Sequence, residues 1–459
     1  MRFRLPVTIL AAMVALTATG RGAARQGVAG APRPQQPQTE INMTISGDAG
    51  AQPRYAVPDF IVRSSDPETA AAARLMGTVL WDDLAFEREF YMVPRDTYKS
   101  IPAARAFAEI AFDRWKELGV DGLVVGSVEK TGANAFRVEV RLFDVKSKAS
   151  VIAKEYNGTA ANPRLYAHTA ADDIHSQQRG LRGVARTKLT FSSDRDNERV
   201  ANTVQARDVK EIYVADYDGA NQRRFTTAHK LNITPVWSPD ARSLAWTAFQ
   251  RVTPDILVSN IYAGMPPENL TGGRGQNWLP SWSPDGTRIC FVSTRDGNSE
   301  LYVMNRDGSN VTRLTNNPAI DVSPTWSPSG TQIAFTSDRS GAPQIYIIDA
   351  DGRNLFKMTA ESWCDRPTWS PAPFNEIAYA SRTGAGYDIK IYDLATQERR
   401  QLTFGEGSNE SPAYAANGRH LAFSSTRYGK RQLFTIDRMG KDVRQLTKVG
   451  NNQTPAWSK

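Results

Sequence analysis

Histidines are the first side chains of this sequence that could do chemistry, as metal ligands or as acids and bases. The four histidines, His168, His175, His229 and His420, are too far apart for the short ligand spacings of a zinc site. We expect His168, on a predicted helix, to pack in the core or between domains. The sequence has no Gly-x-Ser-x-Gly nucleophile elbow and no phosphate-binding glycine-rich loop. It therefore predicts no enzyme activity, no metal and no cofactor.

Acidic pairs and cysteines also have structural explanations. Asp-x-Asp-Gly occurs at residues 216–219 and 349–352, as at the start of a calcium loop, but the remaining ligands, including the final Glu, are missing. Hairpin turns explain these segments better. Cys290 falls inside a predicted strand and Cys364 in the loop before Pro367 of a later repeat. We therefore expect two free, partly buried thiols rather than a disulfide.

A repeat determines the fold of the second half. Pro-x-Trp-Ser recurs with its prolines 45, 44, 43, 45 and 43 residues apart, and the fifth copy is degenerate. This is the period of a four-stranded propeller blade. The first strands of the six blades are marked by Trp237, Trp282, Trp326, Trp369, Tyr414 and Trp457. Each tryptophan is expected to pack between neighbouring blades.

The two ends of the repeat region predict a closed ring. Residues 186–227 provide a second, third and fourth strand, but no Trp-Ser strand precedes them. Residues 455–458 provide that strand at the end of the chain. Pairing them in one blade would close the propeller and remove exposed sheet edges.

An α/β domain is predicted before the propeller. Asp66 and Pro67 open a helix that reaches about Leu84, and a second helix is expected from about Ala103 to Gly119. Strands are expected at 122–129, 135–145 and 150–156, and Asn162-Pro163 opens a third helix. The predicted fold is thus an α/β N-terminal domain, 54–180, followed by an all-β six-bladed β-propeller, 186–459, closed by pairing of its N- and C-terminal strands.

The beginning of the chain predicts export. Residues 1–24 combine Arg2 and Arg4 with an apolar run that is too short to span a bilayer, which needs roughly 20 residues, so they are interpreted as a signal peptide. Residues 25–53 contain a Pro/Gln-rich linker and an N-terminal strand segment. The net charge is +8, but residues 1–39 carry five of these charges. The remainder is nearly balanced, which argues against nucleic-acid binding.

Several motifs in this order resemble the TolB family, the β-propeller component of the Tol-Pal envelope system. They are Glu40-Ile-Asn-Met-Thr-Ile-Ser-Gly47, Val57-Pro-Asp-Phe60, the segments at 121–126 and 167–172, and the Trp-Ser-Pro-Asp-Gly repeats. The resemblance implies a monomeric, non-enzymatic periplasmic scaffold, peripheral to the outer membrane. It further implies binding to the peptidoglycan-associated lipoprotein Pal and to TolA, in support of outer-membrane integrity and constriction during division. The alternative is a propeller that binds a small ligand or carbohydrate, or a lyase.

The resemblance also implies two binding regions. Pal would dock at one mouth of the propeller channel, on loops before the Pro-x-Trp motifs: Gln276, Asn277, Trp278, Leu279, Asp321, Val322, Ser323, Arg366, Glu410 and Ser411. TolA would bind the N-terminal segment made of Glu40, Ile41, Asn42, Met43, Thr44, Ile45 and Ser46. The Pro/Gln-rich linker can precede this segment in the mature chain.

Overall fold

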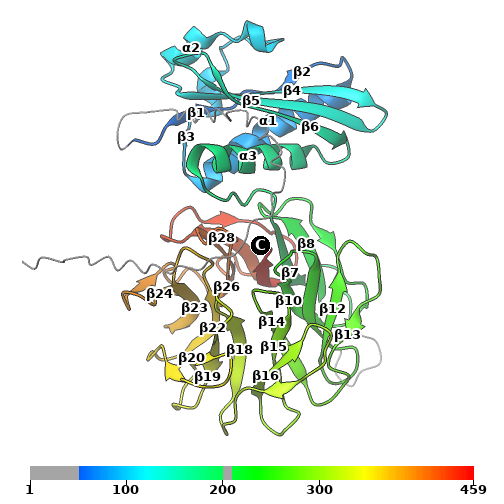
Figure 1. Ribbon diagram of the computed structural model, residues 1–459, viewed down its shortest axis with the longest axis vertical. Coiled ribbons are helices and arrows are strands. Elements are labelled where there is room, and N and C mark those ends of the chain that lie inside the picture. Colours follow the sequence, from blue (N-terminus) through cyan, green and yellow to red (C-terminus); the bar gives the residue numbers. More distant parts are fainter. Residues whose placement is uncertain (1–50, 200–208) are drawn as a thin grey trace, which may run out of the picture. The chain divides into compact units, whose positions relative to one another are not determined.

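The computed structural model describes residues 51–199 and 209–459. These residues belong to one compact unit. The predicted signal peptide, the linker up to residue 50 and the predicted TolA-binding segment lie outside the described residues. Figure 1 shows the two described parts, an α/β domain and a ring of small sheets.

A mixed sheet and its helices form the α/β domain (Figure 1). Its strands run in the order β3-β1-β4-β5-β6, and β2 also pairs with β4; β1, β2 and β3 are parallel to their partners, whereas β4, β5 and β6 are antiparallel. The elements are β1 (Arg54–Ala56), β2 (Ile61–Val62), α1 (Pro67–Glu87), β3 (Tyr91–Met92), the 3₁₀ turns Arg95–Tyr98 and Phe107–Glu109, α2 (Phe112–Glu117), β4 (Gly122–Gly132), β5 (Ala135–Asp144), β6 (Ser150–Thr159) and α3 (Pro163–Arg179).

The predicted first and third helices are confirmed. Asp66 caps α1, because its carboxylate accepts a hydrogen bond from the backbone N–H of Thr69 at 2.9 Å, and Pro67 occupies the first turn. Helix α3 begins at Pro163, as expected. Buried residues of both helices pack with β4 and β5 in one core, which positions α1 and α3 on one face of the sheet.

The prediction of a helix from 103 to 119 is wrong in its first half, where only a 3₁₀ turn forms before α2. Phe107 and Phe112 both pack near Phe143, with ring centroids 6.3 and 5.4 Å from it. Positions five apart on a continuous α-helix point about 140° away from each other. Packing both rings against Phe143 therefore requires the break.

Six four-stranded sheets form the propeller within the described residues, and their innermost strands gather near the centre of the ring in Figure 1. The strands are β7 (Lys188–Ser193), β8 (Glu211–Asp216), β9 (Arg223–Arg224), β10 (Asn232–Trp237), β11 (Ser243–Ala248), β12 (Asp255–Asn260), β13 (Glu268–Asn269), β14 (Asn277–Trp282), β15 (Arg288–Ser293), β16 (Glu300–Asn305), β17 (Thr312–Arg313), β18 (Asp321–Trp326), β19 (Gln332–Ser337), β20 (Gln344–Asp349), β21 (Phe356–Lys357), β22 (Cys364–Trp369), β23 (Glu376–Thr383), β24 (Gly386–Asp393), β25 (Arg399–Gln401), β26 (Asn409–Tyr414), β27 (His420–Ser425), β28 (Gln432–Asp437), β29 (Arg444–Gln445) and β30 (Asn452–Trp457).

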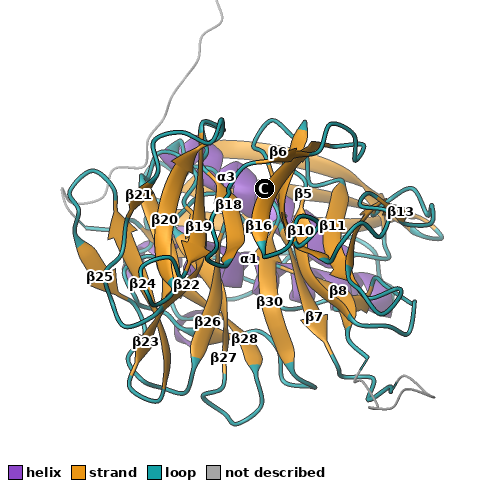
Figure 2. Cartoon of the chain, turned by 90° about the horizontal axis from the view of Figure 1, so that it is seen from below, coloured by secondary structure: helices purple, strands orange, loops and turns teal. Residues whose placement is uncertain are grey.

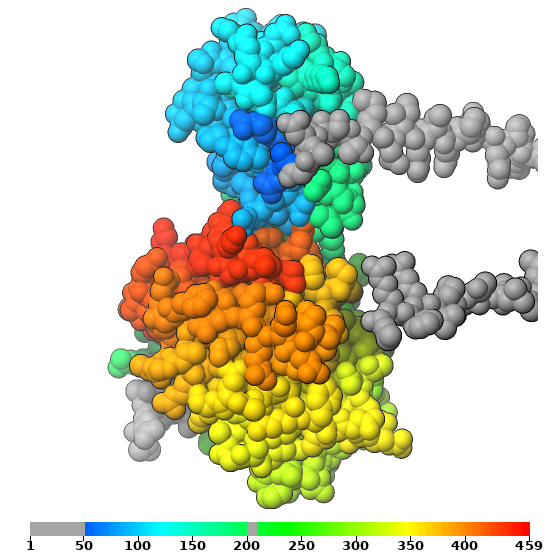
Figure 3. All heavy atoms as spheres, turned by 90° about the vertical axis from the view of Figure 1, so that its left-hand side faces the viewer, coloured from blue at the N-terminus to red at the C-terminus, as the bar shows by residue number. Residues whose placement is uncertain are grey.

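The last strand closes the ring, as the sequence predicts. β30 pairs antiparallel with β7, so that one blade has the order β30-β7-β8-β9. Figure 2 shows β30 between β26 and β7. In the space-filling view of Figure 3, the later blades, coloured yellow to red, pack directly against one another. The propeller is therefore a continuous ring rather than an open sheet.

The repeated tryptophans pack between blades, which confirms their predicted role. Trp326 lies in one buried cluster with Cys290 and Val292 of the preceding blade and Ile333 of its own. Its indole N–H donates to the carbonyl oxygen of Ser281 at 3.2 Å. Each such ring contributes a large apolar contact between two neighbouring sheets.

Both cysteines are free, as predicted, but they are fully rather than partly buried. Cys364, however, is the first residue of β22 rather than part of a loop. Burial raises the pKa of the Cys364 thiol to about 11. Over the described ranges, no helix combines the length and the apolar character needed to cross a membrane.

Candidate protein-docking site

An axial channel runs between the innermost strands of the six blades. Its walls carry the repeated prolines and tryptophans, and it contains a cavity of roughly 320 Å³. Such a cavity matches the lower end of the size range of small-ligand pockets. A rigid frame of this kind can present the loops at either mouth to a partner without rearrangement.

The residue before each channel proline is a bulge in the innermost strand. These residues have φ between 51° and 55°, and the strand register shifts next to each of them. All six line the channel: Thr234, Leu279, Ser323, Arg366, Ser411 and Thr454. Proline cannot donate to the ladder, so the strand accommodates it with a bulge. The prediction that these positions belong to loops is therefore corrected: they lie inside the strands.

Two predicted contact residues are buried in blade corners. Asn277 accepts hydrogen bonds from Ser293 Oγ at 2.8 Å and from the Arg295 guanidinium at 3.2 Å. Asp321 pairs with Arg339 at 2.7 Å. Both side chains are fully buried. They connect the start of the first strand to the end of the second, which is a structural role within the blade.

The other predicted contact residues differ in their exposure to solvent. Gln276 is exposed, whereas Trp278, Leu279, Val322, Arg366 and Glu410 are half-buried, and Ser323 and Ser411 are buried but line the channel. Trp278, Leu279 and Val322 pack against the core between two blades. The structure thus brings Leu279, Ser323, Arg366 and Ser411 together around the channel, but not the whole predicted set.

The sequence analysis did not predict a set of exposed apolar side chains on the edge of the blades where the first strands begin. This rim set consists of Ile320, Trp363, Phe404, Tyr428 and Val449. Its members lie in the loops before β18, β22, β26 and β30 and in the β27–β28 turn, where the first strands begin and the second strands end. Phe404 is 73% exposed and Tyr428 is 70% exposed. An aromatic residue directly before a loop glycine, Gly405 or Gly429, is the signal that marks these two positions.

Comparisons with known proteins agree with this architecture. Residues 41–151 match the TolB amino-terminal domain, and residues 177–459 match the TolB beta propeller domain. The chain belongs to the TolB family. The Tol-Pal system protein TolB of Ruthia magnifica subsp. Calyptogena magnifica is 32% identical over 76% of this chain and 80% of its own length.

Two further TolB proteins extend the comparison. TolB of Desulfosudis oleivorans is 31% identical over 57% of both chains, so this match spans little more than half of that relative. The crystal structure of TolB from Acinetobacter baumannii has a TM-score of 0.74 and 26% identity, and the match covers 89% of this chain and 97% of that one. The chain is therefore a Tol-Pal system protein of a non-enzymatic family.

The two TolB domains contact each other through the opposite edge of the blades, where the first strands end. Arg419, after β26, forms ion pairs with Glu87 and Glu89 of the amino-terminal domain, both at 2.6 Å. Asn417 in the same turn donates to the Glu87 carboxylate at 3.1 Å. The rim set therefore lies on the edge of the blades that does not carry these contacts.

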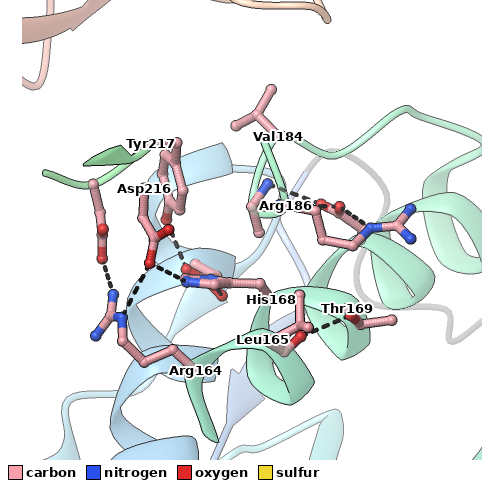
Figure 4. Close-up of polar contacts among 12 residues, drawn as sticks. Arg164, Leu165, His168, Thr169, Val184, Arg186, Asp216 and Tyr217 are labelled. Carbon is pink, nitrogen blue, oxygen red and sulfur yellow. Dashed lines mark hydrogen bonds and ion pairs between the residues drawn. The ribbon is translucent and has the colours of Figure 1, made fainter. Parts of the chain in front are cut away.

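A buried charge network extends this TolB domain contact (Figure 4). His168 Nδ1 lies 2.8 Å from the Asp83 carboxylate, and its Nε2 lies 3.7 Å from that of Asp216 in the propeller. Tyr217 donates to Asp83 at 2.7 Å. Burial opposes protonation of His168, but the paired carboxylates of Asp216 and Asp83 prevail and raise its pKa to about 9. The prediction of a packing or interdomain role for His168 is confirmed, and the turn at 216–219 also contributes to this contact.

Two further buried histidines at the contact behave in the opposite way. His420 stacks on Phe86 with ring centroids 4.2 Å apart, and its Nε2 lies 3.1 Å from the Phe86 carbonyl oxygen. His175 packs against Phe90. Burial and the nearby Arg419 guanidinium lower the pKa of each histidine to about 3. Both rings are therefore neutral where a histidine exposed to water would be partly charged.

The histidine shifts by themselves give the free energy of unfolding a maximum near pH 6.5, and the raised pKa of Glu87, about 7, partly opposes the loss of stability on the acid side. Below it, the unfolded chain binds protons that folded His175 and His420 cannot, so each costs about 2 kcal/mol between pH 6.5 and 5. Above it, stability from protonated His168 is lost as the pH approaches 9. We expect His420→Gln to reduce the loss of unfolding free energy on the acid side of the maximum, the acid limb. His168→Gln should reduce the loss on the alkaline side, the alkaline limb. Urea unfolding from pH 5 to 9 measures both.

The exposed His229 provides the matched control for this pH profile. Its side chain is 67% exposed and contacts only Glu198 among the ion-pair partners of the described residues. His229→Gln should leave both limbs unchanged. A flat profile for the unmodified protein would show that the buried histidines do not control its stability.

Proposed function

We propose that this chain is a periplasmic docking protein of the Tol-Pal system that binds the lipoprotein Pal at the open mouth of its propeller. The rim set is the observation that carries this proposal, because its five exposed apolar side chains lie in loops on the edge of the blades where the channel-lining first strands begin. Aromatic side chains in such positions supply most of the energy of many protein interfaces. Family membership supports the same partner, since the relatives are Tol-Pal system proteins.

The N-terminal segment, residues 40–46, is proposed as the TolA-binding element. Together the two contacts would connect an outer-membrane lipoprotein with TolA and so support outer-membrane integrity and constriction at division. Deletion of residues 40–46 should abolish TolA binding in a pull-down with purified proteins and leave Pal binding intact. Undiminished TolA binding by the deletion variant would refute this part of the proposal.

Removal of the two most exposed rim aromatics should weaken Pal binding. We expect the double variant Phe404→Ala/Tyr428→Ala to bind the soluble domain of Pal about 30-fold or more weakly, measured by isothermal titration calorimetry. Both side chains are largely exposed, so the thermal transition of the free protein should not change.

Tyr262 gives the matched control for this rim experiment. It is as exposed as Tyr428, but it follows β12 on the other edge of the blades. Tyr262→Ala should bind Pal like the unmodified protein. Equal affinity for both variants would place the docking surface elsewhere, and recovery of a bound carbohydrate instead of Pal would favour a ligand-binding propeller.

A further inference from the structure

Two cationic side chains lie in the lining of the propeller channel. Among the residues that line it, all within the described part of the chain, the side chains charged at neutral pH are Arg366 and Lys459, and none is Asp or Glu. Arg366 occupies the bulge before its proline, at the open mouth, whereas Lys459 follows the end of β30 at the other end of the channel. The five positions equivalent to Arg366 are Thr234, Leu279, Ser323, Ser411 and Thr454, which are all shorter and uncharged.

The Arg366 guanidinium has unused hydrogen-bond donors. Its neighbour Asp365 lies 3.9 Å away, beyond hydrogen-bond distance. That carboxylate already accepts hydrogen bonds from Ser323 Oγ at 3.1 Å and Thr336 Oγ1 at 2.9 Å. No described residue accepts a hydrogen bond from the Arg366 side chain, which is 35% exposed. The N–H groups of the planar guanidinium can therefore donate to a ligand that enters the channel from this mouth.

The other carboxylate near this arginine is also paired. Glu410 forms an ion pair with Arg431 at 2.9 Å and accepts a hydrogen bond from Ser408 Oγ at 2.7 Å. These contacts lower the pKa of Glu410 against the effect of its burial, and the charge of Arg366 contributes further. Each carboxylate near the mouth therefore has hydrogen-bond partners, whereas Arg366 has only its ion pair with Asp365 at 3.9 Å.

We propose that the protein partner inserts an acidic side chain into the open mouth, where Arg366 donates to its carboxylate. This inference rests on the proposed docking function and adds the chemistry that the partner must supply. A guanidinium binds a carboxylate through two parallel hydrogen bonds. The surrounding prolines and tryptophans would exclude water from the pair, which strengthens the attraction relative to an exposed salt bridge.

Binding of the soluble domain of Pal to Arg366 variants tests this inference. Arg366→Gln should bind about 30-fold or more weakly than the unmodified protein, and Arg366→Lys should lie between the two because it keeps the charge without the fork. Raising the salt concentration should weaken Pal binding by the unmodified protein more than Pal binding by Arg366→Gln. Arg353→Gln is the matched control, since Arg353 is 81% exposed and lies in the turn between β20 and β21, on the edge away from the mouth.

The outcomes separate the inference from the proposed function. If the unmodified protein does not bind Pal, the proposed function itself fails. If it binds Pal and Arg366→Gln and Arg366→Lys both bind within about twofold of it, with the same salt dependence, the inserted carboxylate is overturned while docking stands. Thermal melts of both variants establish that the fold is retained, because Arg366 has a φ of 54° in a strand bulge.

Discussion

Removal of residues 452–459 is expected to abolish the cooperative folding of the propeller. The deletion takes away β30, which pairs with β7, and opens the ring at both neighbouring edges. It also removes the hydrogen bond that Ser458 Oγ accepts from the Lys188 N–H and the one that Trp457 Nε1 donates to Thr187 Oγ1 at 2.7 Å. We expect loss of the cooperative thermal transition and aggregation, measured by circular dichroism and light scattering.

A milder variant tests the same closure in a folded protein. Trp457 is buried in the cluster that joins the closing blade to residues of the α/β domain. Trp457→Ala should cost about 3–5 kcal/mol of the free energy of unfolding. Trp363→Ala is the matched control, because Trp363 is 37% exposed at the rim and should cost far less. A truncated chain that melts like the full one would contradict the closed ring.

Replacement of Arg419 by alanine is the second change with a large expected effect. It leaves Glu87 buried without its cation, although Val184 N–H and Asn417 still donate to that carboxylate. Burial raises the pKa of Glu87 to about 7 even beside Arg419, so the carboxylate is mostly charged only above neutral pH. Removing one partner of a buried ion pair costs about 3–5 kcal/mol, so Arg419→Ala should destabilise the chain by up to this amount at pH 8 and by less at pH 6. Because the pair joins the two domains, calorimetry should resolve separate transitions for them.

A double variant tests whether the unpaired charge of Glu87 causes the loss of stability in Arg419→Ala. Replacing both residues with methionine removes the unpaired charge, so Glu87→Met/Arg419→Met should recover most of the stability lost in Arg419→Ala. Arg353→Ala, an arginine exposed on the surface, should have an effect within about 0.5 kcal/mol. Equal loss in the single and double variants would show that packing, not the ion pair, holds the domains together.

The repeat made the propeller predictable from sequence. A period of 43 to 45 residues and the missing first strand before Lys188 specified the number of blades and the closing partner. Local signals were equally reliable where the backbone chemistry is strict, as at Asp66 and Pro67. The helix expected from residue 103 failed because the shared contact of Phe107 and Phe112 with Phe143 is a tertiary constraint that an Ala-rich sequence does not reveal.

The docking site was less predictable, for a physical reason. Sequence position placed Asn277 and Asp321 at the mouth, but whether a side chain there points into a blade corner depends on partners such as Arg295 and Arg339 that are 18 residues away. The solvent exposure of the rim set depends on how loops from different blades are arranged in the folded ring, which the sequence does not show. The bulge that directs Arg366 into the channel comes from the next residue, Pro367, and it occurs in every blade.

Site-specific photocrosslinking is the most direct test of docking at the open mouth. A photoreactive amino acid replaces either Tyr428 at the rim or Tyr262 on the other edge of the blades, and each variant is irradiated with the soluble domain of Pal. We predict a crosslinked complex from position 428 and none from position 262. A crosslink from position 262 and none from position 428 would contradict the account.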